Sequence, residues 1–385
     1  MSGSTDENGV PAARRLRVCL VGPSLDILGG QAVQLERLRA GLADSTLVEV
    51  GFLPVNPRLP GPFRQLQRLK FVRTVVTSVA YLWSLLRHVG KYDVVHAFSA
   101  SYWSYVLAPL PALLVGRLYR KGVILNYHSG EAEDHLRRWR HSAVPTMRLA
   151  HAIVVPSGYL VAPFARYGLA ARAVLNFVEL GQIPFRCRVT PRPICLSNRN
   201  LEPLYNVAST LRAFAILQRE VPDAALIVAG DGTARASLEA LAVELQLRQV
   251  EFVGRTPHEQ MGALYDRADI YLNSSNIDNM PLSILEAFAA GLPVVTTDAG
   301  GIPFVVRDRE NGLMVPRDDH VAMAASIVRL LREPSLAARL ASTARDECLS
   351  KYVWPAVRGE WERVYQAVDA QARGDRQAAA LAMRA

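Results

Sequence analysis

The sequence contains few cysteines, and none is spaced like a metal ligand. The chain has four cysteines in 385 residues, and no two form the C-x2-C pair of a zinc site. They are Cys19, Cys187, Cys195 and Cys348. Such sparse use of cysteine is typical of free thiols in a reducing compartment, so we expect no disulfide bonds.

The sequence also lacks an apolar segment that would export or anchor the protein. Met1–Ala13 is polar and has no apolar core of the kind that a signal peptide needs, so we expect residues 1–15 to form a flexible arm. The longest apolar run, Phe71–Leu86, is interrupted by Arg73 and is too short for a membrane span of about 20 residues. We therefore expect a cytoplasmic protein, either free or held peripherally at the inner face of the membrane.

Acidic residues are scarce in the first half of the chain. Residues 1–190 hold 23 Lys and Arg against 11 Asp and Glu, whereas residues 191–385 hold 21 against 24. The excess behind the net charge of +9 therefore lies in the first half. A basic half suggests contact with an acidic surface, for which anionic lipid is the plausible candidate, and we expect no nucleic-acid partner.

Strands that alternate with helices are predicted in both halves. The chain exceeds the usual size of one core, and the alternation predicts parallel sheets. The expected strands are Leu16–Val21, Leu47–Leu53, Asp93–Phe98, Val123–Tyr127 and Ala152–Val155, then Ile194–Ser197, Ala225–Ala229, Val250–Val253, Ile270–Asn273 and Val294–Thr297. We predict an α/β fold of two Rossmann-like, doubly wound domains.

The linker between the two domains is expected at Glu179–Pro193, which contains three prolines and little periodicity. The domains would then occupy residues 16–185 and 186–352. A helix over residues 353–370 is expected to return to the first domain, because its large aromatic side chains need a surface to cover. Residues 371–385 lack a clear apolar stripe and are expected to fray.

A long helix is expected at Gln65–Val89, with basic residues on or near it. They are Arg64, Arg68, Lys70, Arg73 and Arg87. This helix could lie on a membrane, but its charges spread around the axis at 100° per residue. Ordinary packing against a sheet is slightly favoured.

The segment Asn276–Gly291 has the pattern of a helix that opens onto a bound anion. Pro281 suits the first helical position, Asn279 can cap the free backbone donors, and the last glycine ends the helix. Asp278 and Glu286 flank the N-terminus, which carries about half a positive charge. This layout suits a phosphate between two hydroxyl-rich groups.

Two further features lie at predicted strand ends. Gly29-Gly30 stands between a strand and a helix, where a glycine permits close approach to a ligand, although a plain turn explains it equally well. His128 directly follows a strand, on the side where open α/β sheets bind ligands. On these residues alone, a structural histidine remains the better interpretation.

The order of these segments along the chain resembles that of the retaining family 4 glycosyltransferases of GT-B fold. The resemblance covers most of the chain and rests on the order and spacing of several motifs. They are Gly29-Gly30, His128, Ser157, Asn176–Glu179, Gly230-Asp231-Gly232, Gly254 and the pair Asp278 and Glu286. It implies that a nucleotide-sugar donor binds in the second domain, facing a glycan, lipid-linked or small-molecule acceptor on the first across a cleft.

The resemblance also implies roles for individual residues. Glu286 would bind the ribose hydroxyls, Asp278 would hold the donor sugar, and His128 would touch that sugar from the opposite domain. The residues implied to bind the donor are Gly30, Arg199, Tyr205, Gly230, Arg255, Asn279, Met280, Pro281, Leu282, Ser283 and Glu286. Arg199 and the helix from Pro281 would take the diphosphate, and the backbone of Arg255 would meet the base.

No cofactor or metal is expected. The sequence has no Asp-x-Asp motif, and fixed N–H dipoles with an arginine can stabilise a leaving diphosphate without a metal. The resemblance implies that the acceptor attacks the face from which the phosphate leaves, so no protein nucleophile is required.

Three positions depart from the family pattern. Asp278 replaces the usual glutamate, Met280 replaces a smaller residue, and Tyr205 stands where a lysine usually supports Arg199. Tyrosine can donate one hydrogen bond but supplies no charge. Two alternatives therefore stay open: a sugar-nucleotide epimerase of the same fold, and a catalytically weak nucleotide-sugar-binding protein. On residue grounds, Glu286 could also be an exposed helical acid.

Overall fold

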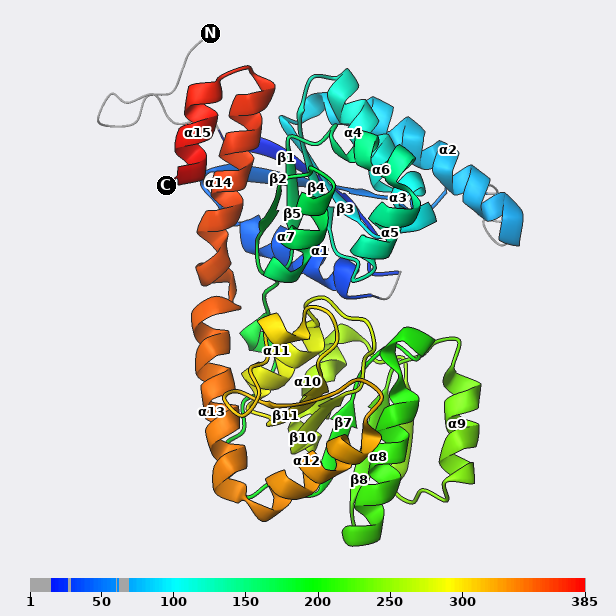
Figure 1. Cartoon of the computed structure of the whole chain (residues 1–385). Helices are drawn as coiled ribbons and strands as arrows, with labels where there is room; N and C mark the ends of the chain where they lie inside the picture. Colours follow the sequence, from blue (N-terminus) through cyan, green and yellow to red (C-terminus); the bar gives the residue numbers. More distant parts are fainter. Residues whose placement is uncertain (1–14, 27–28, 60, 62–68, 385) are drawn as a thin grey trace.

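A computed structural model of the chain contains two α/β domains, joined along one side by long C-terminal helices (Figure 1). The structure describes residues 15–26, 29–59, 61 and 69–384. The predicted arm at residues 1–15 lies outside this part of the chain except for its last residue. Each domain holds one six-stranded parallel sheet, so the predicted fold class is confirmed.

The first domain is built on a sheet with the strand order β2-β1-β3-β4-β5-β6. Its strands are β1 Leu16–Gly22, β2 Val48–Pro54, β3 Val94–Ser99, β4 Gly122–Tyr127, β5 Ala152–Val155 and β6 Ala171–Ala173. Its helices are α1 Gly30–Leu42, α2 Lys70–His88, α3 Tyr102–Leu107, α4 Pro109–Leu118, α5 Ala132–Arg138, α6 Arg140–Met147 and α7 Gly158–Arg166. Strands β3 and β4 are buried along their whole length, as expected where helices cover both faces of a parallel sheet.

The second domain repeats this plan with the order β12-β11-β10-β7-β8-β9. Its strands are β7 Ile194–Ser197, β8 Ala225–Ala229, β9 Val250–Gly254, β10 Ile270–Asn273, β11 Val294–Thr297 and β12 Leu313–Val315. Its helices are α8 Val207–Glu220, α9 Arg235–Glu244, α10 His258–Arg267, α11 Leu282–Ala290, α12 His320–Arg332 and α13 Pro334–Lys351. Short 3-10 turns lie at Val89–Lys91, Leu180–Gln182, Pro203–Tyr205 and Ile302–Phe304.

The strand predictions missed one edge strand in each sheet. Strands β6 and β12 have three residues each, and each pairs with one neighbour at the end of its sheet. So short a segment gives no periodic pattern that a sequence could reveal. The other ten strands lie within about one residue of their predicted limits.

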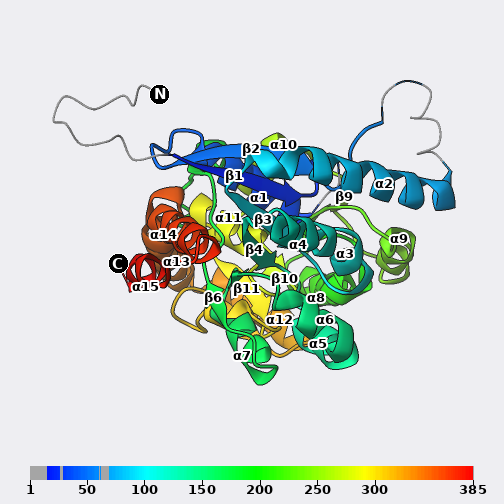
Figure 2. The same cartoon turned by 90° about the horizontal axis from the view of Figure 1, so that it is seen from above.

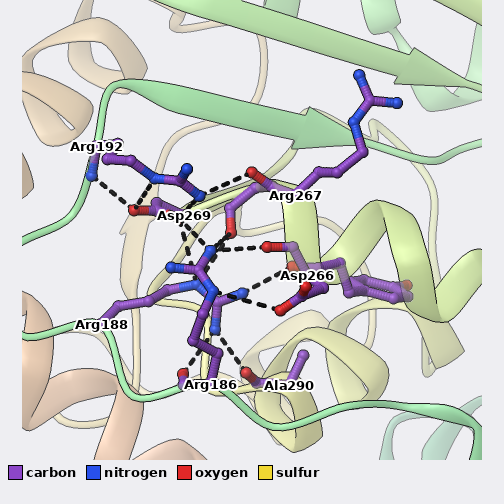
Figure 3. A network of polar contacts seen from close by, with 9 residues as sticks. Arg186, Arg188, Arg192, Asp266, Arg267, Asp269 and Ala290 are labelled. Atoms are coloured by element: carbon purple, nitrogen blue, oxygen red, sulfur yellow. Dashed lines mark hydrogen bonds and ion pairs between the residues drawn. The ribbon is translucent and has the colours of Figure 1, made fainter.

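The second part of the predicted linker is fixed to the second domain by three arginines (Figure 3). Buried Arg188 donates to the carbonyl oxygens of Tyr265, Ala268 and Ala290, near the C-termini of α10 and α11. Arg186 and Arg192 both pair with the carboxylate of Asp269. Free carbonyls at helix ends favour cations, which explains this anchoring. The chain therefore passes between the domains before residue 186.

Helix α14, Trp354–Ala372, carries the chain back to the first domain. Trp361 and Tyr365 are buried in the core that surrounds β1, β3 and α1. The hydroxyl of Tyr365 lies 2.9 Å from Nδ1 of His96 on β3, and the other ring nitrogen of His96 lies 3.0 Å from the Asn126 side-chain amide. The returning helix thus supplies side chains to the core that packs against β3 and β4.

The expected fraying of residues 371–385 is wrong for most of this segment. Helix α15, Arg376–Arg384, folds back beside α14 in both views (Figures 1 and 2) and buries Ala379. Alanine has the highest helix propensity of all residues, so this alanine-rich segment forms a helix although it buries little apolar surface. The prediction relied on the missing apolar stripe and gave propensity too little weight.

Helix α2 begins at Lys70, and residues 65–68 of the helix predicted there lie outside the described part of the chain. Among the residues that the structure describes, no helix combines the length and the apolar character that crossing a bilayer requires.

Candidate active site

A cleft of about 430 Å³ lies between the two domains. Its walls come from the ends of strands and the beginnings of helices in both domains, as expected for open parallel sheets. All thirteen residues to which the family resemblance gave a role in the site line this cleft: Gly30, His128, Arg199, Tyr205, Gly230, Arg255, Asp278, Asn279, Met280, Pro281, Leu282, Ser283 and Glu286. The structure therefore brings together residues that are up to 256 positions apart, from Gly30 to Glu286.

Helix α11 opens onto the cleft, but it begins one residue later than predicted. Pro281 has an extended ψ of 118° and occupies the N-cap position, so Leu282 is the first helical residue. The prediction that Asn279 caps the helix is wrong, because its side-chain oxygen instead accepts a hydrogen bond from Ser157 of the first domain. With no side-chain cap, the first N–H groups of α11 and their partial positive charge stay at the cleft. Gly291 ends the helix in the left-handed conformation, as predicted.

A second helix N-terminus lies opposite the first. Helix α1 begins at Gly30, and a Cβ placed on Gly30 would lie 3.6 Å from Cδ1 of Leu282. The N-termini of α1 and α11 therefore meet across the cleft, one from each domain. Two such ends concentrate backbone N–H donors and positive dipole ends on one small volume, which favours an anion there.

Arg199 and Asp278 form an ion pair on the wall of the cleft. Nη2 of Arg199 lies 2.7 Å from Oδ2 of Asp278, and Nη1 lies 3.2 Å from the Ser283 hydroxyl. Burial acts most strongly on the pKa of Arg199 and would lower it, but the attraction of Asp278 and of the neighbouring tyrosines together raises that pKa above its ordinary value. Nε of Arg199 is buried and has no hydrogen-bond partner among the residues that the structure describes. The guanidinium is therefore a fixed cation with one donor still free.

Tyr205 lies flat against this arginine. The guanidinium carbon of Arg199 is 4.2 Å from the centroid of the Tyr205 ring, a cation–π distance. Burial raises the pKa of the Tyr205 hydroxyl although Arg199 acts to lower it, so the ring stays neutral. Tyr205 therefore supports Arg199 through the face of its ring and supplies no charge of its own.

Glu286 is buried and is held by two donors. Nη2 of Arg37, on α1 of the first domain, lies 2.6 Å from one carboxylate oxygen, and the Tyr265 hydroxyl lies 2.7 Å from the other. The reading of Glu286 as an exposed helical acid is therefore wrong. Arg37 also donates to the carbonyl of Phe177 at 3.1 Å, within its own domain. The ion pair thus ties the two domains together at the cleft.

Sequence reasoning missed Arg37 and Tyr265. Arg37 lies between two core leucines, Leu35 and Leu38, in a helix that otherwise reads as ordinary packing. No local signal marks its partner, which lies 249 residues away. Tyr265 lies on α10 among apolar residues, where a buried tyrosine is common.

His128 lies on the first domain's side of the cleft, directly after β4. Its ring stacks on Phe98 with centroids 5.4 Å apart, and within the described part of the chain its buried Nε2 has no hydrogen-bond partner. Burial lowers the pKa of His128 to about 4, so the ring is neutral near pH 7. A neutral imidazole with a free ring nitrogen can donate to or accept from a hydroxyl group, depending on its tautomer.

Residues of both domains hold the turn that leads into α11. The Asn176 side chain of the first domain donates to the carbonyl of Met280 at 3.1 Å. On the other side, Gly300 has φ +52°, and a Cβ there would come within 2.2 Å of the Asp278 carbonyl. Only glycine fits this position, which explains why the loop after β11 contains a glycine pair.

Gly230 and Arg255 have less direct places in the cleft. Gly230 has φ +132°, and a Cβ there would lie 2.4 Å from the carbonyl of Arg199, so this glycine lets the loop after β8 pack against the arginine's backbone. The Arg255 side chain is exposed and reaches the carbonyl of Asp26 in the first domain at 3.4 Å. Within the described residues, no group of three or more His, Cys, Asp or Glu side chains is arranged to hold a metal ion.

Comparisons with known protein families match both halves of the chain. The family described as "Glycosyltransferase Family 4" matches residues 28–182, and the family described as "Glycosyl transferases group 1" matches residues 187–347. Glycogen synthase of Mycobacterium tuberculosis is 31% identical over 74% of this chain and 70% of its own length. Phosphatidyl-myo-inositol mannosyltransferase of Mycobacterium leprae is 26% identical over 72% of this chain and 74% of its own.

Solved structures have the same two-domain fold. Sucrose-phosphate synthase from Thermosynechococcus elongatus aligns with a TM-score of 0.73 at 20% identity, over 93% of this chain and all of its own. HepE from Anabaena, solved in complex with UDP-glucose, aligns with a TM-score of 0.72 at 16% identity, over 94% of this chain and all of its own.

Proposed function

The chain belongs to the family 4 glycosyltransferases of GT-B fold, and we propose that it moves a sugar from a nucleotide-sugar donor to an acceptor hydroxyl with retention of anomeric configuration. The same proposal places this reaction in glycan or polysaccharide biosynthesis. The observation that carries it is that the N-termini of α1 and α11 meet in a cleft that Arg199, Asp278 and Glu286 also line.

The cleft offers separate partners for the diphosphate, the ribose and the sugar of a nucleotide-sugar. The N–H groups of α1 and α11 and the guanidinium of Arg199 suit the diphosphate, whose charge they oppose. Glu286 accepts two hydrogen bonds, and a carboxylate has about four acceptor sites, so two remain for the ribose hydroxyls. Asp278 and His128, one from each domain, are left to contact the sugar.

Charge stabilisation of the leaving group is the main chemical task in this reaction. When the bond between the anomeric carbon and the phosphate oxygen breaks, negative charge collects on the nucleoside diphosphate. Fixed dipoles and a buried cation stabilise this charge without reorganisation, and removing one such donor typically costs about 10²- to 10³-fold in rate. We therefore propose that transfer needs no metal and that Arg199, supported by Tyr205, supplies a full positive charge at the diphosphate.

Retention follows if the acceptor attacks from the side on which the phosphate leaves. The acceptor oxygen forms its bond to the anomeric carbon, the phosphate oxygen departs, and the acceptor proton passes to that phosphate oxygen. His128 is neutral near pH 7, so in this scheme it orients a sugar hydroxyl and is not a proton donor.

The acceptor would bind against the basic first domain. Relatives differ in what their names say of the acceptor, from glycogen to phosphatidyl-myo-inositol. The excess of basic residues in the first half favours an acceptor presented at an anionic surface, with the protein held peripherally at the inner face of the membrane.

Product analysis tests this function. The purified protein is incubated with candidate UDP-, GDP- and ADP-sugars and an acceptor, and the products are separated and examined by NMR. Retaining transfer yields free nucleoside diphosphate and a glycoside with the donor's anomeric configuration. An inverted glycoside would contradict retention, an epimerised sugar still bonded to its nucleotide would identify an epimerase, and unchanged donor would identify a binding protein.

A further inference from the structure

The outer side of helix α2 is apolar and exposed. Tyr81 and Leu85 point into the first domain and are buried, which is the packing that the sequence favoured. That packing accounts for one side of the helix only. Val75, Val79 and Trp83 are 64%, 63% and 61% exposed, and at 100° per residue they fall on one stripe turned away from the buried side. Val72, Leu82 and Leu86 widen this stripe.

Helices α3 and α4 extend the exposed apolar surface beside α2 (Figures 1 and 2). Trp103 on α3 and Leu118 on α4 are 68% and 71% exposed, and Leu107 and Leu114 lie one turn from them. The hydroxyl of Tyr119 donates to the carbonyl of Leu86 at 2.8 Å, which fixes the end of α4 against α2. We call the exposed apolar residues of these helices the outer face: Val72, Val75, Val79, Leu82, Trp83, Leu86, Trp103, Leu107, Leu114 and Leu118.

The segment of the sequence that carries the outer face is rich in positive charge. Residues 64–130 contain nine Lys and Arg and a single acidic residue, Asp93. Asp93 is held in an ion pair with Arg17 of β1. Asp134 of α5, which accepts a hydrogen bond from Tyr102 on α3, is likewise paired, with Arg137 and Arg138. On α2 itself, Arg73 and Arg87 are exposed, and the guanidinium carbon of Arg87 lies 5.3 Å from the centroid of the Trp83 ring. An apolar stripe beside basic side chains matches a bilayer surface with anionic headgroups.

We propose that the outer face docks on an anionic lipid bilayer, with Trp83 and Trp103 at the level of the headgroups and the basic side chains on lipid phosphates. A partner of neutral or basic surface would gain nothing from nine positive charges, which is why lipid is favoured over a second copy of this basic domain. Helix α3 follows Ala100, which lines the cleft, so docking would place a membrane-held acceptor near the donor site. This last point rests on the proposed function, whereas the docking itself does not.

Vesicle binding tests the proposal. The full chain is sedimented with vesicles of phosphatidylcholine alone or with 30% phosphatidylglycerol, without any nucleotide-sugar. We expect binding to the anionic vesicles only, weakened by 0.5 M salt because exposed charges are then screened. Val79→Asp and Trp83→Ser should each weaken partitioning by about tenfold or more, since they remove the apolar contact.

Two matched variants control for the loss of any exposed apolar side chain. Val243→Asp on α9 and Val321→Asp on α12 change exposed valines of the second domain, and both should bind vesicles as the wild type does. Thermal unfolding shows whether each variant is folded, and donor binding should be unchanged in all four. The proposal is overturned if the wild type does not bind anionic vesicles, or if Val79→Asp binds them as the wild type does. It is also overturned if light scattering shows that the wild type is a dimer and that Val79→Asp is a monomer.

Discussion

Arg37 on α1 and Glu286 on α11 form a buried ion pair of 2.6 Å that joins the two domains at the donor site. Glu286 is the residue for which we propose ribose binding, so the contact between the domains and the grip on the nucleotide share one carboxylate. Arg37 and Tyr265 take one acceptor site on each carboxylate oxygen and leave the others free. The pair can therefore persist while the ribose binds, and it fixes the direction in which Glu286 points.

Arg37→Met should weaken donor binding by about tenfold or more and lower the melting temperature. Breaking a buried pair by removing one partner typically costs about 3–5 kcal/mol, because the other charge stays buried and unpaired. Calorimetric titration with the donor and thermal unfolding measure the two effects. Arg39→Met, an exposed arginine on the same helix, is the control and should behave as the wild type. Unchanged donor affinity in Arg37→Met would show that Arg37 does not position Glu286.

Tyr205→Phe should keep most of the donor affinity, whereas Tyr205→Ala should lose about 2- to 30-fold. The ring stacks on Arg199, and such a contact is worth about 0.5–2 kcal/mol. Donor titration of both variants measures the difference. If phenylalanine is as damaging as alanine, the hydroxyl group rather than the ring carries the function, and the account of Tyr205 as a support for Arg199 fails.

Folding stability should fall as the pH is lowered from about 6.5 to 4. Burial, together with the neighbouring His128, lowers the pKa of His96 to about 3, and burial lowers that of His128 to about 4. In this range the unfolded chain binds protons that the folded chain does not, at about 1.4 kcal/mol per pH unit for each such histidine. Melting temperatures at a series of pH values measure the slope.

A histidine variant isolates this contribution. His128→Asn should flatten the dependence of melting temperature on pH, while His141→Asn, which changes an exposed histidine, should leave it as in the wild type. A slope that stays the same in both variants would assign the acid sensitivity to other groups.

Chelation should leave turnover unchanged. If Arg199 and the two helix N-termini hold the diphosphate, then EDTA removes nothing that the reaction needs. Initial rates are compared in EDTA and in added Mg²⁺ or Mn²⁺. A rate that collapses in EDTA and recovers with either ion would contradict the metal-free proposal.

The sequence was most informative where one segment carries both a pattern and a function. The segment Asn276–Gly291 correctly predicted the helix, its glycine end and both carboxylates, because turn chemistry and helix periodicity are local. The predicted cap is wrong because the Asn279 side chain accepts a hydrogen bond from Ser157, which lies 122 residues earlier in the chain. Arg37 was missed for the same reason. Contacts between domains depend on how two separate sheets are placed, which no local pattern encodes.

The unexpected tyrosine is a second case of this kind. In the sequence, Tyr205 stands where the family usually has a lysine, and this left a catalytically weak protein as an alternative. The structure gives the side chain another role, since its ring packs on the guanidinium of Arg199, which forms the ion pair with Asp278. A sequence shows whether a site has lost a charged residue. It does not show which groups the replacement side chain contacts.

Donor binding to a Glu286 variant tests the central claim most directly. Thermal shifts are recorded for the wild type, Glu286→Gln and Glu347→Gln with UDP-, GDP- and ADP-sugars, since a bound ligand raises apparent stability by mass action. Glu347, on α13, is also a buried acid of the second domain, but it pairs with Arg307 and does not line the cleft. We predict that one class of donor stabilises the wild type and Glu347→Gln and that Glu286→Gln loses this shift. A shift of full size in Glu286→Gln, or no shift with any donor in the wild type, would contradict a nucleotide-sugar site at α11.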